Sequence, residues 1–187
     1  MRAKKRILVA IGLAVVMILM FAGQSLAAPP DIQNHWAEKQ ISDWVGKGYI
    51  SGYPDGSFKP DNGITRAEFI TLVNSSFGKS AVGQISYPDV AAEDWFAVEV
   101  ARAAAAGYIS GYDDGAFRPN ENIKRQEAAV IITKLLNLAV SADADALRQF
   151  ADYTAIPQWS KGYIGAVVAA GYMSGYPDQT YQPEGYI

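Results

Sequence analysis

The sequence predicts an all-α fold built from tandem helix-loop-helix repeats. An eleven-residue run at 48–58 returns at 107–117 and at 171–181 with the same order of glycine, tyrosine and turn residues. A tryptophan lies twelve residues before the first glycine of each run, and the apolar residues between them recur at helical spacing. Self-similarity of this kind indicates a repeat architecture, here with offsets of 59 and 64 residues.

The first 27 residues have the pattern of a secretory signal peptide. Basic residues at 2–6 precede an apolar run at 7–21, and the small residues Ser25 and Ala27 follow, two positions apart. A membrane anchor is the alternative, but the run has 15 residues and a helix that crosses a bilayer needs about 20. We therefore expect cleavage after Ala27 and no membrane association afterwards.

The composition after the leader excludes several function classes. Four of the 16 basic residues belong to the leader, so 12 remain against 19 acidic residues, and no basic footprint for nucleic acid is left. The chain has no cysteine, hence no disulfide or zinc-thiolate site. His35 is the only histidine and has Lys39 four residues later, where a second metal ligand would stand. We expect no metal, no cofactor and no catalysis.

The first helix of each repeat is predicted from an apolar stripe that ends at a glycine. Spacings of four, seven and eight residues place the stripe on one helical face. Gly48, Gly107 and Gly171 follow, where a left-handed residue ends a helix. The stripe residues are Ala37, Ile41, Trp44, Val45 and Tyr49; Phe96, Val100, Ala103, Ala104 and Tyr108; and Ile164, Val167, Val168 and Tyr172.

The second helix is predicted to open at Thr65, which with Glu68 forms a capping box. In the second repeat Lys124 replaces the threonine, while Arg125 and Glu127 keep their places. The predicted buried faces are Phe69, Leu72, Val73 and Phe77, and Ile131, Ile132, Leu135 and Leu136.

Linkers of small and polar residues separate the units, which gives repeats at 28–84, 85–146 and 147–187. The third repeat is incomplete, because Ile187 matches Ile64 and Ile123, one residue before the helix cap. We expect that Ile164 and Val168 lack a helix to bury them, and that the gene continues into a motif like Thr-Arg-x-Glu.

The motif at 52–68 resembles the S-layer homology domain of bacterial surface proteins. It reads Gly-Tyr-x-Asp-Gly-x-Phe-x-Pro at 52–60, followed by Ile-Thr-Arg-Ala-Glu at 64–68. The resemblance implies a secreted protein at the cell wall, in which three repeats form a pseudo-threefold trimer. It also implies grooves that hold a secondary cell-wall polysaccharide, often through a pyruvylated sugar, with Arg66 and Arg125 facing the ligand's carboxylate.

The residues themselves support an anion site at these arginines. A cation in the first turn of a helix is slightly unfavourable, so its presence at Arg66 and again at Arg125 needs a reason. Free backbone N–H groups and a guanidinium together suit a planar carboxylate. The alternative is a solvated arginine, or an ion pair with an acid of a neighbouring repeat. We expect both arginines to be exposed, so that lysine would leave folding near wild type.

The loop tyrosines are further ligand candidates. Tyr53, Tyr112 and Tyr176 follow glycines and offer a flat face with one polar tip to a sugar; packing between repeats is the alternative. Gly52 and Gly111, directly before them, are counted with the ligand-binding set.

Other motif residues are predicted to be structural. Trp36, Trp95 and Trp159 are expected in the core. Asp55 and Asp114 belong to turns, since a calcium loop needs more alternating acids. Gln179 replaces the turn glycine and puts the third loop's equivalence in doubt.

Two other functions compete with wall anchoring. The chain could be the front part of a larger surface enzyme such as a glycoside hydrolase, whose catalytic part would lie beyond Ile187. It could also be a structural protein that builds a surface lattice by S-layer self-assembly. The sequence following Ile187 would distinguish the first alternative, and self-assembly without wall material would favour the second.

Overall fold

The computed structural model describes residues 28–140 and 145–187. Within them all regular structure is helical, with no strand and only two isolated bridges, which confirms the all-α prediction. The predicted signal peptide lies outside the described residues. The chain divides into a first unit that ends at Pro60 and a second unit from Asp61 to Ile187.

The first unit contains the 3-10 helix η1 (Pro30–Ile32) and helix α2 (Glu38–Gly46). Its small core consists of Ile32, Ile41 and Val45, so two of the predicted stripe residues are buried as expected. The chain leaves α2 through Gly48, whose φ of 71° is the left-handed value predicted for the residue that ends the helix.

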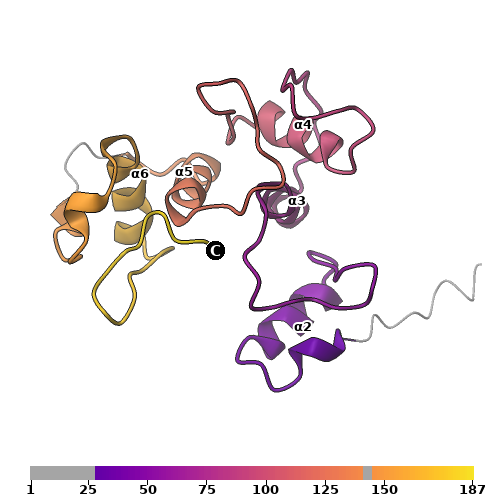
Figure 1. The fold of residues 1–187 in the computed structure, drawn as a ribbon, viewed down its shortest axis with the longest axis horizontal. Helices are drawn as coiled ribbons and strands as arrows, with labels where there is room; N and C mark the ends of the chain where they lie inside the picture. Colours follow the sequence, from indigo (N-terminus) through magenta and orange to yellow (C-terminus); the bar gives the residue numbers. More distant parts are fainter. Residues whose placement is uncertain (1–27, 141–144) are drawn as a thin grey trace, which may run out of the picture. The chain divides into compact units, whose positions relative to one another are not determined.

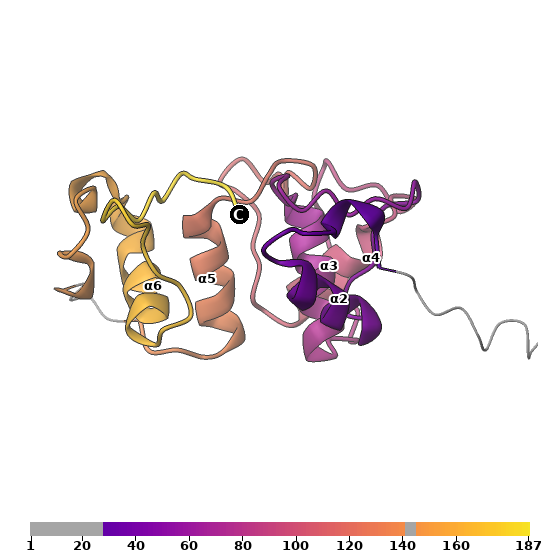
Figure 2. The same ribbon diagram turned by 90° about the horizontal axis from the view of Figure 1, so that it is seen from below.

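The second unit contains two pairs of packed helices (Figures 1 and 2). Helix α3 (Arg66–Phe77) packs on α4 (Ala97–Ala105), and α5 (Arg125–Leu135) packs on α6 (Gln158–Ala169). The 3-10 helices η2 (Asp145–Leu147) and η3 (Tyr153–Ala155) precede α6.

Each pair joins the second helix of one repeat to the first helix of the next. Ile70 and Val73 of α3 share a core with Val100 of α4. Ala129 of α5 is buried with Ile164 and Val167 of α6. The expectation that Ile164 would lack a burying surface is therefore wrong, because α5 of the preceding repeat supplies it.

The starts of three repeat motifs meet in the second unit through a closed cycle of backbone hydrogen bonds. The N–H of Ile123 donates to the carbonyl of Ile64 at 3.0 Å, that of Ile187 to Ile123 at 3.2 Å, and that of Ile64 to Ile187 at 2.9 Å. Each isoleucine therefore donates to one equivalent residue and accepts from the other. The pseudo-threefold trimer of whole repeats stays a prediction.

An aspartate near the start of each repeat holds the loop that follows the first helix. Both carboxylate oxygens of Asp89 accept backbone N–H groups, from Phe117 at 2.9 Å and Arg118 at 2.6 Å. Asp152 accepts in the same way from Tyr181 and Gln182, both at 2.8 Å. In the first unit Asp31 accepts from Phe58 at 2.9 Å and Lys59 at 2.7 Å.

These carboxylates stabilise a strained backbone. Lys59, Arg118 and Gln182 have φ values of 56°, 57° and 55°, which are costly for residues other than glycine. Two charge-assisted bonds to one aspartate offset that cost. Burial alone would raise the pKa of Asp89, but the N–H groups of Phe117 and Arg118 outweigh it and lower the pKa.

The loop turns are equivalent in all three repeats. The N–H of Tyr53 bonds to the Ser57 carbonyl at 2.7 Å, and Tyr112 and Tyr176 make the matching bonds at 2.8 Å. Gln179 adopts a φ of 64°, as its glycine counterparts do at 83° and 82°. The doubt about the third loop was therefore unfounded, since glutamine accepts the left-handed conformation there.

Several side chains predicted to be buried are exposed instead. Trp36, Trp95 and Trp159 are 89%, 62% and 55% exposed, so the core assignment is wrong. The neighbouring residues Phe96 and Ser160 are buried in the second unit. Phe77, at the end of α3, is also exposed.

Within 28–140 and 145–187, no helix has the length and apolar character to cross a membrane.

Candidate functional site

The candidate site begins with the cap of α3. Thr65 Oγ1 accepts the N–H of Glu68 at 3.3 Å, and Glu68 Oε2 accepts the N–H of Thr65 at 2.8 Å, which is the predicted capping box. In α5 only one of the two capping-box hydrogen bonds is present: Glu127 Oε2 accepts the N–H of Lys124 at 3.0 Å. The caps fix where each following arginine leaves its helix.

The backbone N–H groups at these helix starts are not free, contrary to the expectation from the sequence. The N–H of Arg66 donates to the Glu121 carbonyl at 2.9 Å, and that of Ala67 to Pro119 at 3.0 Å. Arg125 and Gln126 donate in the same way to carbonyls of the following loop, at 2.7 and 3.0 Å. Any anion bound here must therefore use side-chain donors.

Arg66 lies between α3 and the loop of the second repeat. Its Nε donates to the Phe117 carbonyl at 2.9 Å, and its guanidinium carbon is 4.7 Å from the ring centre of Tyr112 and 4.9 Å from that of Phe117. Arg66 Nη1 is 3.4 Å from Glu127 Oε2. We call Arg66, Tyr112, Phe117 and Glu127 the first arginine site.

Arg66 is only 6% exposed, so the expectation of a solvent-exposed arginine is wrong. The alternative interpretation, an ion pair with an acid of a neighbouring repeat, describes the observed contact. Glu127 also accepts a short hydrogen bond from the hydroxyl of Tyr112. Burial, with this bond as a further cause, raises the pKa of Tyr112, so the phenol stays protonated and donates.

Arg125 repeats this geometry in the next junction. Its Nε donates to the Tyr181 carbonyl at 2.9 Å and its Nη2 to the Ser174 carbonyl at 2.6 Å. The guanidinium carbon is 4.7 Å from the ring centre of Tyr176 and 4.8 Å from that of Tyr181. We call Arg125, Ser174, Tyr176 and Tyr181 the second arginine site. Burial raises the pKa of Tyr181 to about 12.

The two sites differ in their charged neighbours. In the first, Arg118 also stacks on Tyr112, at 4.1 Å, and pairs with Asp114 at 2.8 Å. The equivalent of Arg118 in the third repeat is the neutral Gln182. Arg125 is half-buried and belongs to no ion pair among the described residues.

The candidate glycines allow close packing of an aromatic ring in the second unit. A Cβ on Gly111 would lie 2.8 Å from Tyr87 Cε1, and one on Gly175 would lie 2.4 Å from Phe150 Cε1. On Gly52 it would meet the Ser57 carbonyl oxygen at 2.5 Å. Glycine is therefore required here for packing, whatever its part in ligand binding.

In the first unit, Tyr53 lies beneath a lysine. Lys59 Nζ is 4.4 Å from the Tyr53 ring centre and 3.7 Å from Asp55. Asp55 forms the predicted turn, since its carboxylate accepts the N–H of Ser57 at 3.0 Å. Asp114 forms the same turn with Ala116 at 3.0 Å.

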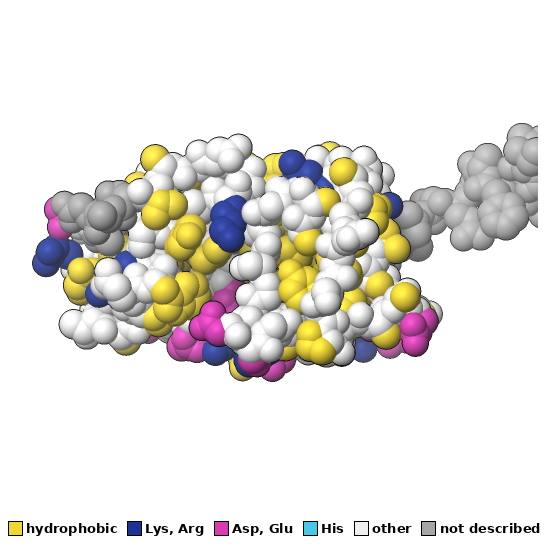
Figure 3. Space-filling view, turned by 90° about the horizontal axis from the view of Figure 1, so that it is seen from above, with side chains coloured by type: hydrophobic (Ala, Val, Ile, Leu, Met, Phe, Trp, Pro, Cys, Tyr) yellow, Lys and Arg dark blue, Asp and Glu magenta, His cyan; other side chains and the backbone are white. Residues whose placement is uncertain are grey.

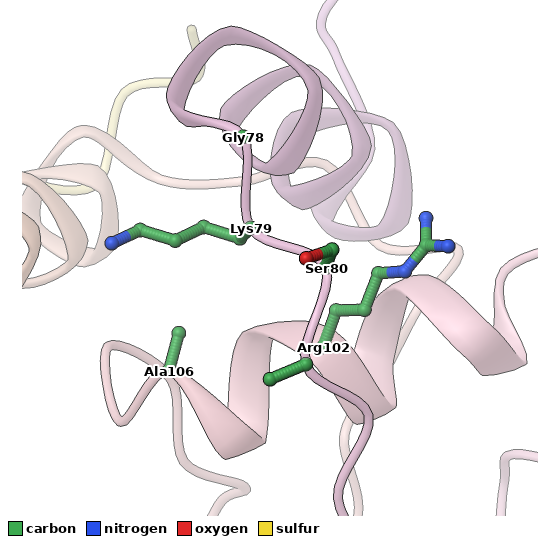
Figure 4. A pocket seen from close by; sticks show the side chains of 6 residues that line it. Gly78, Lys79, Ser80, Arg102 and Ala106 are labelled. Carbon is green, nitrogen blue, oxygen red and sulfur yellow. The ribbon is translucent and has the colours of Figure 1, made fainter.

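A separate hollow lies at the other end of α3 (Figure 4). It has a volume of about 300 Å³ and is lined by Gly78, Lys79, Ser80, Ala81, Arg102 and Ala106. Lys79 and Arg102 lie at the carboxyl ends of helices, where the helix dipole stabilises cations. Their presence there needs no anionic ligand.

Other chemistry has little support in the described part of the chain. Residues 28–140 and 145–187 contain no cluster of three or more metal-ligating side chains. On the face drawn in Figure 3, the lysine and arginine side chains are scattered among hydrophobic patches. A clustered basic footprint for nucleic acid is not present on that face.

Two features of the sites were not anticipated from the sequence. The bracing role of Asp89 and Asp152 was missed, although their recurrence near the repeat starts was the available signal. The contact between Arg66 and Glu127 was not specified either, because the two residues are far apart in the sequence and belong to different repeats.

The fold and sites define a helical repeat module whose arginines are held at the junctions between repeats. The family model for the S-layer homology domain matches residues 30–70, 86–129 and 149–187, which is well over half of the chain. The chain therefore belongs to the S-layer homology domain family.

Several relatives agree with this assignment. Cell surface glycoprotein 1 of Acetivibrio thermocellus is 33% identical over 151 residues, covering 75% of this chain and 6% of that protein. The Cellulosome-anchoring protein of the same organism is 33% identical over 146 residues, covering 74% and 32%. Exoglucanase XynX of Acetivibrio thermocellus is 27% identical over 158 residues, covering 83% and 14%.

The family and these relatives assign the chain to a secreted protein at the bacterial cell surface. It spans less than a third of the length of each relative named above, at 6%, 32% and 14%.

Proposed function

We propose that the chain anchors its protein to the bacterial wall by binding an anionic secondary cell-wall polysaccharide through the arginine sites. The supporting observation is that Arg66 and Arg125 occupy equivalent places, each held by a loop carbonyl and stacked on a loop tyrosine. A guanidinium fixed in this way suits a carboxylate, such as that of a pyruvylated sugar.

The tyrosines complete the proposed site. Tyr112 and Tyr176 place an aromatic ring beside each guanidinium, so a sugar could meet an apolar face and a positive charge together. Tyr53, Gly52 and Gly111 remain proposed ligand residues on the same loops. We likewise propose the repeat boundaries 28–84, 85–146 and 147–187.

Sedimentation with wall sacculi tests this proposal. The secreted chain should co-sediment with intact sacculi and should not do so with sacculi stripped of their secondary polysaccharide. Arg125→Lys should weaken this binding about tenfold, since lysine keeps the charge but loses the two-pronged donor geometry. Arg102→Lys, at the other end of the helix pair, is the matched control and should bind as wild type. Equal binding to both sacculus preparations would refute the polysaccharide as the ligand.

The competing lattice function makes a different prediction. A lattice protein assembles through protein–protein contacts without wall material. Anchoring requires the wall and leaves the secreted chain unassembled in its absence. Salt-independent assembly of the purified chain, measured by light scattering, would favour the lattice function. The name of the exoglucanase relative agrees with a third architecture, in which the same anchor carries an enzyme.

A further inference from the structure

We propose that the cation six residues after a loop tyrosine binds an acidic group of the wall polymer, as Lys59 in the first repeat and as Arg118 in the second. The inference rests on the proposed function and goes further, because it adds a charged ligand residue to each of these two loops. Each cation lies on its tyrosine and beside an aspartate of the same loop. The two loop triads are Tyr53, Asp55 and Lys59, and Tyr112, Asp114 and Arg118.

The backbone of each loop is held so that it presents this side chain. Lys59 and Arg118 have φ values of 56° and 57°, a conformation that glycine adopts freely and that is costly for a long side chain. Asp31 accepts the N–H of Lys59 at 2.7 Å, and Asp89 accepts that of Arg118 at 2.6 Å. A long cation at a strained position, held there by a carboxylate in both loops, indicates a role for the side chain itself.

In the second repeat the side chain of Arg118 is held in place and accessible. Its guanidinium carbon lies 4.1 Å from the Tyr112 ring centre, and its Nη2 is 2.8 Å from Asp114 Oδ2. The side chain is nevertheless 38% exposed. The guanidinium of Arg66 lies near the same ring, at 4.7 Å, but Arg66 is only 6% exposed as a residue. Of these two guanidiniums, that of Arg118 is therefore the one that a ligand can reach.

The loop of the first repeat has the same arrangement with a lysine. Lys59 Nζ lies 4.4 Å from the Tyr53 ring centre and 3.7 Å from Asp55 Oδ2, and the lysine side chain is 42% exposed. These contacts all lie within residues 53–59, so the arrangement is a property of the loop itself. Two loops with different cations thus place a positive charge on an aromatic face in the same way.

The loop aspartate can give way to an acidic sugar. An ion pair between two exposed side chains contributes little to stability, and Asp114 is 54% exposed. Asp114 also accepts the N–H of Ala116 at 3.0 Å, a turn bond that does not depend on Arg118. A sugar carboxylate can therefore replace Asp114 at the guanidinium, while the apolar face of the sugar ring meets Tyr112.

Neutral variants of the two cations test this inference by sedimentation with intact sacculi. Glutamine is a suitable replacement, because Gln182 adopts a φ of 55° at the matching position of the third loop. Arg118→Gln and Lys59→Gln should each weaken binding about fivefold, and the variant that carries both should bind more weakly than either. The controls Lys47→Gln and Arg148→Gln remove exposed cations that pair with an aspartate outside these loops, and they should bind as wild type.

Two further variants distinguish ligand binding from a structural role. Arg118→Lys should keep most of the binding, since a lysine has this place in the first loop. Asp114→Asn should strengthen binding, because it removes the acid that competes for Arg118 while its amide oxygen can still accept the Ala116 N–H. A purely structural ion pair predicts the opposite, since losing it would loosen the loop and weaken binding.

A titration of the wild-type chain tests Arg118 without any substitution. The probe is a hexose that carries a pyruvate acetal, with the unmodified hexose for comparison, and the signal is the Arg118 Nε–Hε resonance in ¹⁵N NMR spectra. We expect this signal to shift with the acidic sugar and to stay in place with the neutral one. If a glutamine variant does not fold, this titration decides the assignment.

The outcomes separate this inference from the proposed function. If the wild-type chain binds intact sacculi and the variant with both glutamines binds equally well, the inference is overturned and the proposed function stands. Weaker binding by Asp114→Asn, or an Arg118 signal that does not move at saturating acidic sugar, would also overturn the inference alone. Failure of the wild-type chain to bind intact sacculi, or equal binding to stripped sacculi, would overturn both.

Discussion

Arg66→Lys is expected to destabilise the second unit, although it keeps the positive charge. Arg66 is 6% exposed as a residue, and its guanidinium makes three kinds of contact at once. It donates Nε to the Phe117 carbonyl at 2.9 Å, lies 4.7 Å from the Tyr112 ring centre, and faces Glu127 at 3.4 Å. A single ammonium cannot reproduce all three from one position.

The magnitude follows from the contacts that lysine cannot make. A hydrogen bond from a charged donor contributes about 1.5–3 kcal/mol, and a stacked cation at a partly buried ring about 0.5–1 kcal/mol. Lysine retains an attraction to Glu127 and recovers part of the energy of the cation stacked on the ring. We therefore expect a loss of about 2–3 kcal/mol in the free energy of unfolding. Arg125→Lys should cost about 1 kcal/mol, because water can replace bonds at a half-buried site.

Urea unfolding measures these free energies. The transition can be followed by helical circular dichroism, with Arg102→Lys as a conservative control outside both arginine sites. We expect the control to be the most stable of the three variants, Arg125→Lys to be less stable, and Arg66→Lys to be the least stable. If Arg66→Lys unfolds within about 0.5 kcal/mol of wild type, the buried contacts do not hold the junction and the magnitude above is refuted.

Three further predictions concern the loops. The hydrogen bonds that lower the pKa of Asp89 stabilise the fold above the pKa of the unfolded chain, and this stabilisation is lost as the pH falls through the folded pKa. Between pH 6 and about 3, the melting temperature of Asp89→Asn should therefore fall less steeply than that of the wild type. Gly175→Ala should cost about 2–3 kcal/mol in urea unfolding, because its Cβ would lie 2.4 Å from a ring carbon, whereas Gly46→Ala should cost nothing. Gln179→Gly should raise the melting temperature, since a φ of 64° costs other residues about 1 kcal/mol; an unchanged or lower value would show that no strain is present.

The local structure of this protein was predictable because it depends on residues near each other in the chain. The glycines that end the first helices, the capping box of Thr65 and Glu68, and the turn at Asp55 all appear as expected. Backbone preferences and short-range side-chain bonds decide these features, and both can be recognised in the sequence.

Burial was predicted less well for residues at the borders of the apolar helix faces. Trp36 and Trp95 precede their helices by two residues, and Trp159 is the second residue of α6. All three are exposed, while the neighbouring Phe96 is buried. Hydrophobicity alone does not distinguish the last residue inside a face from the first outside it. Only the packing of α3 on α4 decides which aromatic is covered.

The sequence by itself determined the helical repeats, the secreted class of the chain and the two arginines at helix starts. Only the tertiary structure decided that each second helix packs on the first helix of the next repeat, and that Arg66 is buried beside Glu127 of the following repeat. The reason is that repetition fixes what each unit contains, whereas burial and pairing of charges depend on which units are brought together. Equivalent positions in a repeat therefore differ in chemistry once their neighbours differ.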